Sequence, residues 1–317
     1  MSTEEINKLF PVFQRLLPGV KTGSGNSPST ISRQWMLLFG LSTPLLILAG
    51  YLLCYFAPPQ LINQYAVQLL GRVDSDILIF ILAGFTAQMI DGALGMAYGV
   101  TATSFLLSVG VPPAASSASV HASEVVTSGV SGLMHLKFRN VNTKLFRNLL
   151  LPGILGAILG AYVLSTFEHY NYIVKPIISI YTMFLGLLII FKALRKDRIR
   201  EKIKRVFPLA AIGGFLDSIG GGGWGPIVSS TLIAGGRNAK YSIGSANLTE
   251  FFVSLASSIT FFTLIGLTHL YIIAGLIIGG VIAAPIAAFL ANKLPTRMTM
   301  LLVGIVVIVV SLKRLFL

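Results

Sequence analysis

The chain has 317 residues, of which 54% are hydrophobic and only 11% are charged. A soluble domain carries roughly 25% charged residues, so the composition excludes a soluble protein and predicts an all-α integral membrane protein. The formal net charge is +13, but the basic residues cluster in short loops between apolar segments, where they orient a membrane protein, and we therefore expect no nucleic-acid partner.

The first part of the chain is predicted to be an extension with one membrane span. Residues 1–34 form a tail in which Glu4–Leu17 has apolar residues at helical spacing, which fits either a helix on the membrane surface or a disordered tail. The first apolar run begins near Trp35, so no cleavable signal peptide is expected. The segment Trp35–Ala57 is long enough to cross a hydrocarbon core of about 30 Å, and we assign residues 35–76 to an accessory transmembrane helix and its loop. The single cysteine, Cys54, lies in this span and forms neither a disulfide framework nor a metal site.

Two of the apolar segments that follow are interrupted by glycine. The segments run over residues 77–110, 113–136, 145–165, 172–194, 207–235, 240–267, 270–292 and 298–312. In 207–235 an apolar helix reaches Ile219, and the next four residues are glycines, each of which costs a helix about 1 kcal/mol relative to alanine. Pro226 is tolerated in the first turn of a helix. The pattern predicts a helix, a bare-backbone turn and a second helix.

The two interrupted segments belong to two related halves. Gly92 and Gly95 align with Gly222 and Gly225 at a separation of 130, whereas Ser119 to Glu124 align with Ser245 to Glu250 at 126, which we interpret as one small insertion. Interrupted apolar segments at matching places are typical of repeat-built transporters. We expect repeat 1 over 77–195, a basic cytoplasmic linker over 196–206 and repeat 2 over 207–317.

Basic residues decide how these segments cross the membrane. If both interrupted segments crossed it, the basic loops after residues 136 and 194 would lie outside, against the preference of such loops for the cytoplasm. We therefore expect both segments to fold back as re-entrant hairpins, with seven full crossings and a cytoplasmic N-terminus. Each half is then a hairpin plus three crossings, and because three is odd the two repeats are inverted. Their glycine turns are expected to meet near the membrane midplane, where only protein or a polar cavity can bury broken backbone.

The turns are candidate anion sites. Helix N-termini attract anions, and glycine lets an oxyanion approach the backbone. The alternative is that the glycines only allow close helix packing. Tyr98 and Trp224 would either wall the pocket or belong to the core. The candidate ligands in these turns are Asp91, Gly92, Gly95, Gly221, Gly222 and Gly223.

Four carboxyl groups are predicted to lie within the membrane, where ionisable groups are costly and point to an ion path or a proton relay. They are Asp91, Glu124, Asp217 and Glu250. His121 lies one turn before Glu124 on the same helix face, so the two could exchange a proton. The alternative is a permanently neutral carboxyl group that locks helices together. We expect no metal, because His121 and Glu124 offer two ligands without a third.

The segments that carry Glu124 and Glu250 are rich in small hydroxyl residues, which in membranes serve mostly for close packing. Three polar residues beside the glutamates are candidate substrate ligands: Ser123, Asn247 and Thr249. The motifs Gly156-x-x-x-Gly160 and Gly275-x-x-x-Gly279 are predicted helix-packing faces.

At these residues the chain resembles the sulfite exporter TauE/SafE family, also called the toluene-sulfonate uptake permease family. The resemblance covers about residues 77–317 and rests on the stretches AGFTAQMIDGALGMAYGVTATS, PPAASSASVHASEVVTSGVSGLMH, LPGILGAILGAY, GGFLDSIGGGGWGPIVSS and GSANLTEFF. It implies transport of sulfur oxyanions (sulfite, sulfonates or sulfoacetate) by a proton-linked or gradient-driven carrier. Asp91-Gly-Ala-Leu-Gly95 replaces the first of the two glycine runs common in the family.

We therefore expect a multi-pass transporter in the cell inner membrane whose partners are a small anion, protons and the lipid bilayer. The alternative is an anion channel of the same architecture. An enzyme is not expected, because the sequence offers neither a nucleophile with a base nor a full ligand set, and no cofactor is expected. A homodimer through the extra first helix is compatible with the sequence.

Overall fold

The computed structural model describes residues 76–94, 96–194, 205–266, 269–291 and 296–316, all within one compact unit, Gln68–Leu317. These residues are helical, and no strand occurs among them. The predicted surface helix Glu4–Leu17 and the accessory span Trp35–Ala57 lie outside the described residues.

The predicted segments appear as helices close to their expected bounds. In the first half they are α4 (Asp76–Leu94), α5 (Tyr98–Ser108), α6 (Pro113–Lys137), α7 (Thr143–Thr166), the short 3-10 turn η1 (Glu168–Tyr170) and α8 (Asn171–Leu194). In the second half they are α9 (Val206–Gly220), the π-helical turn η2 (Trp224–Ser229), α10 (Ser230–Ala234), α11 (Ala239–Ile265), α12 (Leu270–Ala291) and α13 (Thr296–Phe316). Both interrupted segments are therefore broken as expected, α4 from α5 and α9 from η2.

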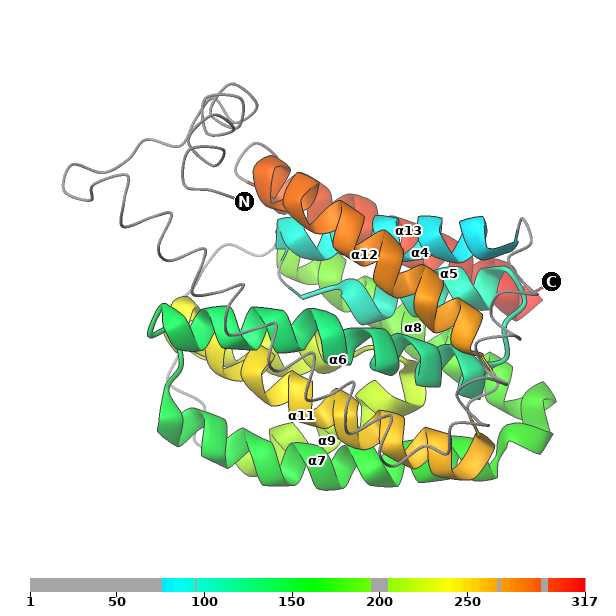
Figure 1. Cartoon of the computed structure of the whole chain (residues 1–317), viewed down its shortest axis with the longest axis horizontal. Helices are drawn as coiled ribbons and strands as arrows, with labels where there is room; N and C mark the ends of the chain where they lie inside the picture. Colours follow the sequence, from blue (N-terminus) through cyan, green and yellow to red (C-terminus); the bar gives the residue numbers. More distant parts are fainter. Residues whose placement is uncertain (1–75, 95, 195–204, 267–268, 292–295, 317) are drawn as a thin grey trace, which may run out of the picture. The chain divides into compact units, whose positions relative to one another are not determined.

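Helices of one half pack against helices of the other. The main pairs are α4 with α12, α7 with α9, α6 with α11, and α8 with α13. Figure 1 shows α12 beside α4 and α11 beside α6 and α7. Glycines bring these backbones together: a Cβ atom added at Gly156 would lie 2.1 Å from the carbonyl oxygen of Ala211, and one added at Gly279 would lie 2.0 Å from that of Ile81. The prediction of two glycine packing faces is confirmed.

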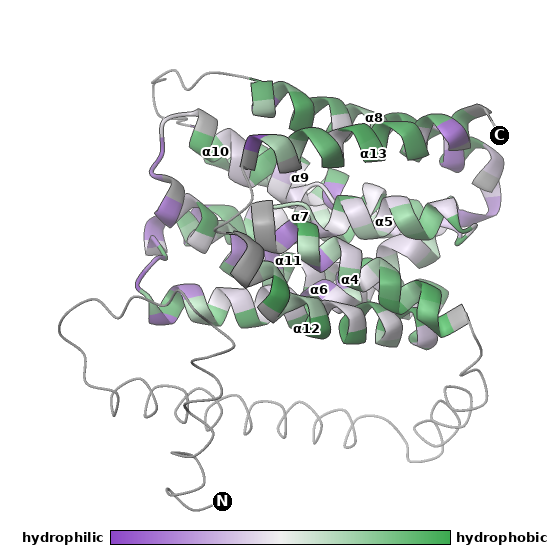
Figure 2. Ribbon diagram, turned by 90° about the horizontal axis from the view of Figure 1, so that it is seen from above, coloured by the Kyte–Doolittle hydropathy of each residue, from purple (hydrophilic) through white to green (hydrophobic). Residues whose placement is uncertain are grey.

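The outer helices carry a hydrophobic surface that suits lipid. Figure 2 shows α8, α12 and α13 to be hydrophobic along most of their length. Large apolar side chains such as Phe184, Val281 and Val306 are more than half exposed. By length and composition, three helices can cross a membrane: Thr143–Thr166, Tyr172–Leu194 and Lys240–Ile265. Ile77–Asp91, Val206–Gly220, Leu270–Ala284 and Met300–Lys313 are shorter apolar helices, and the seven crossings and two hairpins stay a prediction.

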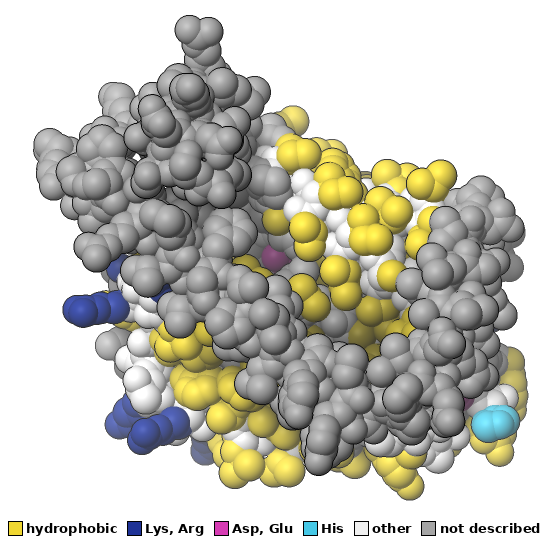
Figure 3. Space-filling model, in the orientation of Figure 1, with side chains coloured by type: hydrophobic (Ala, Val, Ile, Leu, Met, Phe, Trp, Pro, Cys, Tyr) yellow, Lys and Arg dark blue, Asp and Glu magenta, His cyan; other side chains and the backbone are white. Residues whose placement is uncertain are grey.

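Charged side chains are segregated on the face shown in Figure 3. Lysine and arginine gather at one edge, at the end of the bundle where α6 ends and α7 and α11 begin. The rest of the visible described surface is largely hydrophobic, and it is hollowed between α12 and α6, with an acidic side chain at the base of the hollow.

Candidate functional site

After each break, the carboxylate of an aspartate caps the first N–H groups of the next helix. The first N–H groups of a helix have no partner within the helix and need an acceptor from elsewhere. Oδ1 of Asp91 accepts hydrogen bonds from the N–H groups of Ala97 (2.8 Å) and Tyr98 (3.2 Å), at the start of α5. Oδ1 of Asp217 accepts them from Gly223 (2.6 Å) and Trp224 (2.8 Å), at the start of η2. The amide groups that we expected to attract a substrate anion are therefore occupied by the protein's own carboxyl groups.

The two breaks contact each other, as expected from the sequence. A Cβ atom added at Gly99 would lie 2.7 Å from Cα of Gly222, and one added at Gly225 would lie 2.5 Å from the carbonyl oxygen of Met96. Thr103 also donates a hydrogen bond from its hydroxyl to the carbonyl of Gly221. The backbones cross so closely at these points that no side chain fits between them.

The contacts also correct the alignment of the halves. Asp91 and Asp217 make the same pair of hydrogen bonds and lie 126 residues apart, as do Tyr98 and Trp224. Glu124 and Glu250 have the same separation. The separation of 130 residues that aligned the glycines was therefore wrong, because it did not align the two aspartates that cap the restarting helices. The correct separation is 126 residues throughout, so no insertion lies between the breaks and the glutamates.

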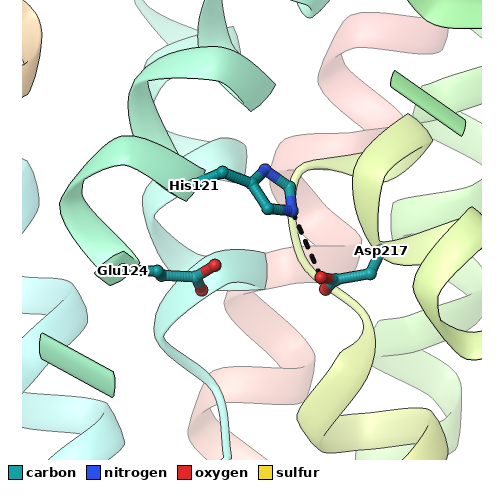
Figure 4. A group of neighbouring side chains, drawn as sticks. All are labelled: His121, Glu124 and Asp217. Atoms are coloured by element: carbon teal, nitrogen blue, oxygen red, sulfur yellow. Dashed lines mark hydrogen bonds and ion pairs between the residues drawn. The ribbon is translucent and has the colours of Figure 1, made fainter. Parts of the chain in front are cut away.

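His121 joins α6 to the second break. Its Nδ1 lies 2.8 Å from the carbonyl oxygen of Ser117, which can only accept, so Nδ1 carries a hydrogen. Its Nε2 lies 3.2 Å from Oδ2 of Asp217 (Figure 4). An unprotonated Nε2 and a carboxylate oxygen would be two acceptors facing each other, so this contact needs one further proton, on the ring or on the carboxyl group. His121 and Asp217 are both fully or almost fully buried.

Glu124 completes a buried cluster with these two residues. One ligand atom from each of His121, Glu124 and Asp217 lies within 4.8 Å of the others, and Figure 4 shows the three side chains converging from α6 and α9. Oε2 of Glu124 accepts a hydrogen bond of 3.3 Å from the hydroxyl of Ser254. The sequence suggested only two cation ligands, because nothing in it placed Asp217 beside α6; the structure supplies a third. Such a cluster can hold a proton or a cation.

Among the described residues, no basic side chain other than His121 forms an ion pair at this site. Within the part of the chain that the structure describes, no lysine or arginine pairs with any of the four carboxyl groups, and the one ionic partner among them is His121. Buried carboxylates without a cation are expensive in a membrane, so proton binding is a direct way to reduce their charge.

Among its described residues, the second half has no equivalent cluster. Asn247 stands 126 residues after His121 and donates a hydrogen bond of 2.9 Å to the hydroxyl of Ser131. Thr249 donates to the carbonyl of Ser245 within its own helix. Glu250 is half-buried and makes no hydrogen bond to a described residue. All three residues lie on α11, and none of them takes part in the hydrogen bond between His121 and Asp217.

The two aromatic candidates have different surroundings. The hydroxyl of Tyr98 donates to Oγ of Ser123 at 3.1 Å, and Ser123 donates in turn to the carbonyl of Val120. Trp224 is fully buried in an apolar cluster with Leu149 and Val253, and its Nε1 donates to the carbonyl of Ala246 at 3.1 Å. Both rings therefore belong to the core, and the hydroxyl of Tyr98 also joins a polar chain.

The remaining candidates are glycines. Gly92 lies in the last turn of α4, and Gly95 lies outside the described residues. Gly221, Gly222 and Gly223 form the buried turn between α9 and η2. Two hydroxyl residues that the sequence had assigned to packing also contact the cluster: Ser117 lies 3.3 Å from Nδ1 of His121, and Ser254 contacts Glu124. The spacing of Ser117, one turn before His121, was the available signal.

Comparison with known proteins identifies relatives of the whole described unit. A family described as "Sulfite exporter TauE/SafE" matches residues 80–314. The chain is 38% identical over 250 residues to the "Probable membrane transporter protein YtnM" of Bacillus subtilis (strain 168), which covers 75% of this chain and 82% of that protein. No solved structure matches the chain.

Proposed function

The chain belongs to the TauE/SafE sulfite exporter family of membrane transporters, and we propose that it is a proton-coupled secondary transporter of small sulfur-containing oxyanions. The substrate class is sulfite, sulfonates or sulfoacetate, and the membrane is the cell inner membrane. A transporter of this kind is not an enzyme and acts on its substrate by moving it.

The observation that carries the proposal is the crossing of two acid-capped helix breaks beside the cluster of His121, Glu124 and Asp217. Unwound backbone inside a membrane protein is typical of sites that bind substrate or coupling ions. Buried ionisable side chains in the same place are typical of proton paths. We therefore place both the substrate and the coupling proton near this crossing.

The negative charges of the site favour transport of the proton and the anion in the same direction. An anion that approaches the crossing meets four carboxyl groups, and like charges repel strongly in a medium of low dielectric constant. The anion binds when protons have reduced that charge, so proton and anion occupy the site together and cross the membrane together. His121 and Asp217 hold the proton that their contact requires, Glu124 is its neighbour, and Glu250 is the mate of Glu124 in the second half.

The exchange of partners between the halves supports an inverted repeat. α4 packs on α12 as α9 packs on α7, and in each case the partner comes from the other half. In this arrangement one repeat rocks against the other and exposes the crossing to each side of the membrane in turn. The basic edge in Figure 3 supports a cytoplasmic position for that end of the bundle.

Uptake of labelled sulfite into proteoliposomes, with and without an imposed pH gradient and with unlabelled sulfonates as competitors, tests the proposal. A carrier gives saturable uptake that the gradient accelerates and that the true substrate class inhibits. An anion channel gives flux that does not saturate and does not respond to the proton gradient at constant membrane potential. Folded protein that moves neither sulfite nor a sulfonate would exclude this substrate class.

A further inference from the structure

We propose that Lys192 is a positioning residue for transport: it holds the restarted helix of the second break in its π-helical form and thereby keeps the two breaks in contact. This inference deepens the proposed function and rests on it for the role of the crossing in transport. It concerns α8 and η2, whose side chains take no part in the cluster of His121, Glu124 and Asp217.

The π-helical turn distinguishes the second break from the first. The counterpart of η2, 126 positions earlier, is 98–103, and these residues are regular α-helix in α5. Pro226 does not account for the difference, because it is the third residue of the restarted helix, where an N–H group has no partner within the helix. Since the repeat itself permits an α-helix here, the contacts of η2 must favour the wider turn.

The carbonyl group of Pro226 shows how this turn is held. In an α-helix it would accept a hydrogen bond from the N–H of Ser230. Here the N–H of Ser230 is bonded to the carbonyl groups of Gly225 and Ile227. The carbonyl of Pro226 instead accepts hydrogen bonds from the ammonium group of Lys192 and from the hydroxyl of Ser230. Lys192 also donates to the hydroxyl of Ser230, so the three groups form one closed network.

Lys192 reaches this carbonyl from a firm support. It lies in the last turn of α8 and is half-buried, and no carboxyl group of a described residue pairs with it. Hydrogen bonds that a charged group donates are about twice as strong as neutral ones. α8 packs tightly on α13, because a Cβ atom added at Gly304 would lie 2.9 Å from the carbonyl oxygen of Gly186. The ammonium group therefore fixes η2 to a well-packed helix of the first half.

The corresponding contact of the first break is apolar. Val100, the counterpart of Pro226, packs in a cluster with Val303 and Val307 of α13. Valine side chains offer no hydrogen-bond donor, and the segment is α-helical. The π-helical form thus occurs in the half whose neighbouring helix supplies an ammonium group.

The form of η2 decides where the two breaks touch. A π-helical turn holds about one residue more than an α-helical turn, and each residue turns a helix by about 100°. If η2 became α-helical, the residues before Pro226 would rotate by about that angle relative to α10. Gly225 would then leave its contact with Met96, where an added Cβ atom lies 2.5 Å from the carbonyl oxygen. Loss of the Lys192 ammonium group is therefore expected to displace the second break from the first.

Hydrogen–deuterium exchange of the full-length protein in detergent, followed by mass spectrometry, tests the hold on η2 without any substrate. Lys192→Met removes the ammonium group and keeps an unbranched side chain, whereas Lys192→Arg keeps a charged donor. Lys175→Met is the matched control, because Lys175 is an exposed lysine of the same helix. We expect Lys192→Met to speed exchange in residues 224–231 by about 10-fold or more, the factor that one hydrogen bond of a charged group provides. Lys192→Arg should restore most of the protection, and Lys175→Met should not change it.

The same measurement separates a local effect from a loss of global stability. Global destabilisation would speed exchange in α11 as well as in η2, whereas the proposed contact affects η2 alone. Exchange of η2 at the wild-type rate in Lys192→Met would overturn the positioning role.

Sulfite uptake into proteoliposomes tests the link to transport. Lys192→Met should lower kcat/KM for sulfite by about 10-fold or more, mainly through a higher KM, because a misplaced site binds its substrate less well. Lys192→Arg should recover most of this loss. Faster exchange of η2 with an unchanged kcat/KM would overturn the link to the site. If folded wild type moves no sulfite while Lys192→Met still loosens η2, the hold on the π-helical turn is supported and the transport function is contradicted.

Discussion

Replacing Asp217 tests whether the second break depends on its acidic cap. Oδ1 of Asp217 is the acceptor for the N–H groups of Gly223 and Trp224, all fully or almost fully buried. In Asp217→Ala both N–H groups lose their partner, at about 1 to 3 kcal/mol each, so the variant should be about 2 to 6 kcal/mol less stable than the wild type. Asp217→Asn keeps an oxygen acceptor for both N–H groups but removes its charge, so each of the two hydrogen bonds should be weaker by about 1 kcal/mol.

Thermal unfolding in detergent, followed by circular dichroism, measures the difference. With an unfolding entropy of about 2.1 cal/mol/K per residue, each kcal/mol lowers the unfolding temperature of a chain of 317 residues by roughly 1.5 °C. Asp217→Ala should therefore unfold at least about 3 °C below the wild type, and Asp217→Asn should lie between them. Ser108→Ala is the control, because its exposed hydroxyl bonds only to Phe105 of the same helix. Unfolding of Asp217→Ala at the wild-type temperature would refute the assignment of the cap.

Three further substitutions examine other parts of the site. Glu124→Gln keeps the shape of the side chain and removes its titration, so sulfite uptake should lose its response to a pH gradient while unfolding is unchanged; a preserved response in proteoliposomes would exclude Glu124 from coupling. Gly222→Ala puts a Cβ atom 2.2 Å from the carbonyl carbon of Gly99 at a φ of +150°, and we expect a loss of about 3 kcal/mol or more in stability; wild-type stability would show that the breaks do not cross this closely. Trp224→Phe loses the hydrogen bond to Ala246 and some core packing, so the variant should be about 1 to 3 kcal/mol less stable and should keep the wild-type KM for sulfite. A changed KM would show that Trp224 lines the substrate site.

The fold was predictable where local signals were strong. Helix bounds followed the apolar runs, and the breaks followed the four glycines before Trp224 and the glycines around Asp91. These signals are local because glycine weakens a helix wherever it stands. The number of membrane crossings rests on loop charge and stays a prediction, and the span Trp35–Ala57 lies outside the described residues.

The site was predictable only in part. All four carboxyl groups and His121 were named from the sequence, since ionisable residues stand out in apolar segments. Their pairing was not, because the contact of His121 with Asp217 joins residues 96 positions apart. The role of the aspartates as caps was visible in principle, because Asp91 and Asp217 share the 126-residue separation of Glu124 and Glu250, but matching glycines concealed it.

The most direct test of the central claim, that protons and a sulfur oxyanion cross together at this site, is to record both fluxes in one preparation. Proteoliposomes loaded with a pH-sensitive dye receive labelled sulfite at a clamped membrane potential. We predict that saturable sulfite entry acidifies the lumen, that an imposed gradient with acid outside accelerates entry, and that Glu124→Gln abolishes this acceleration. Sulfite entry that leaves the lumenal pH unchanged and ignores the gradient, with correctly folded wild-type protein, would contradict the account.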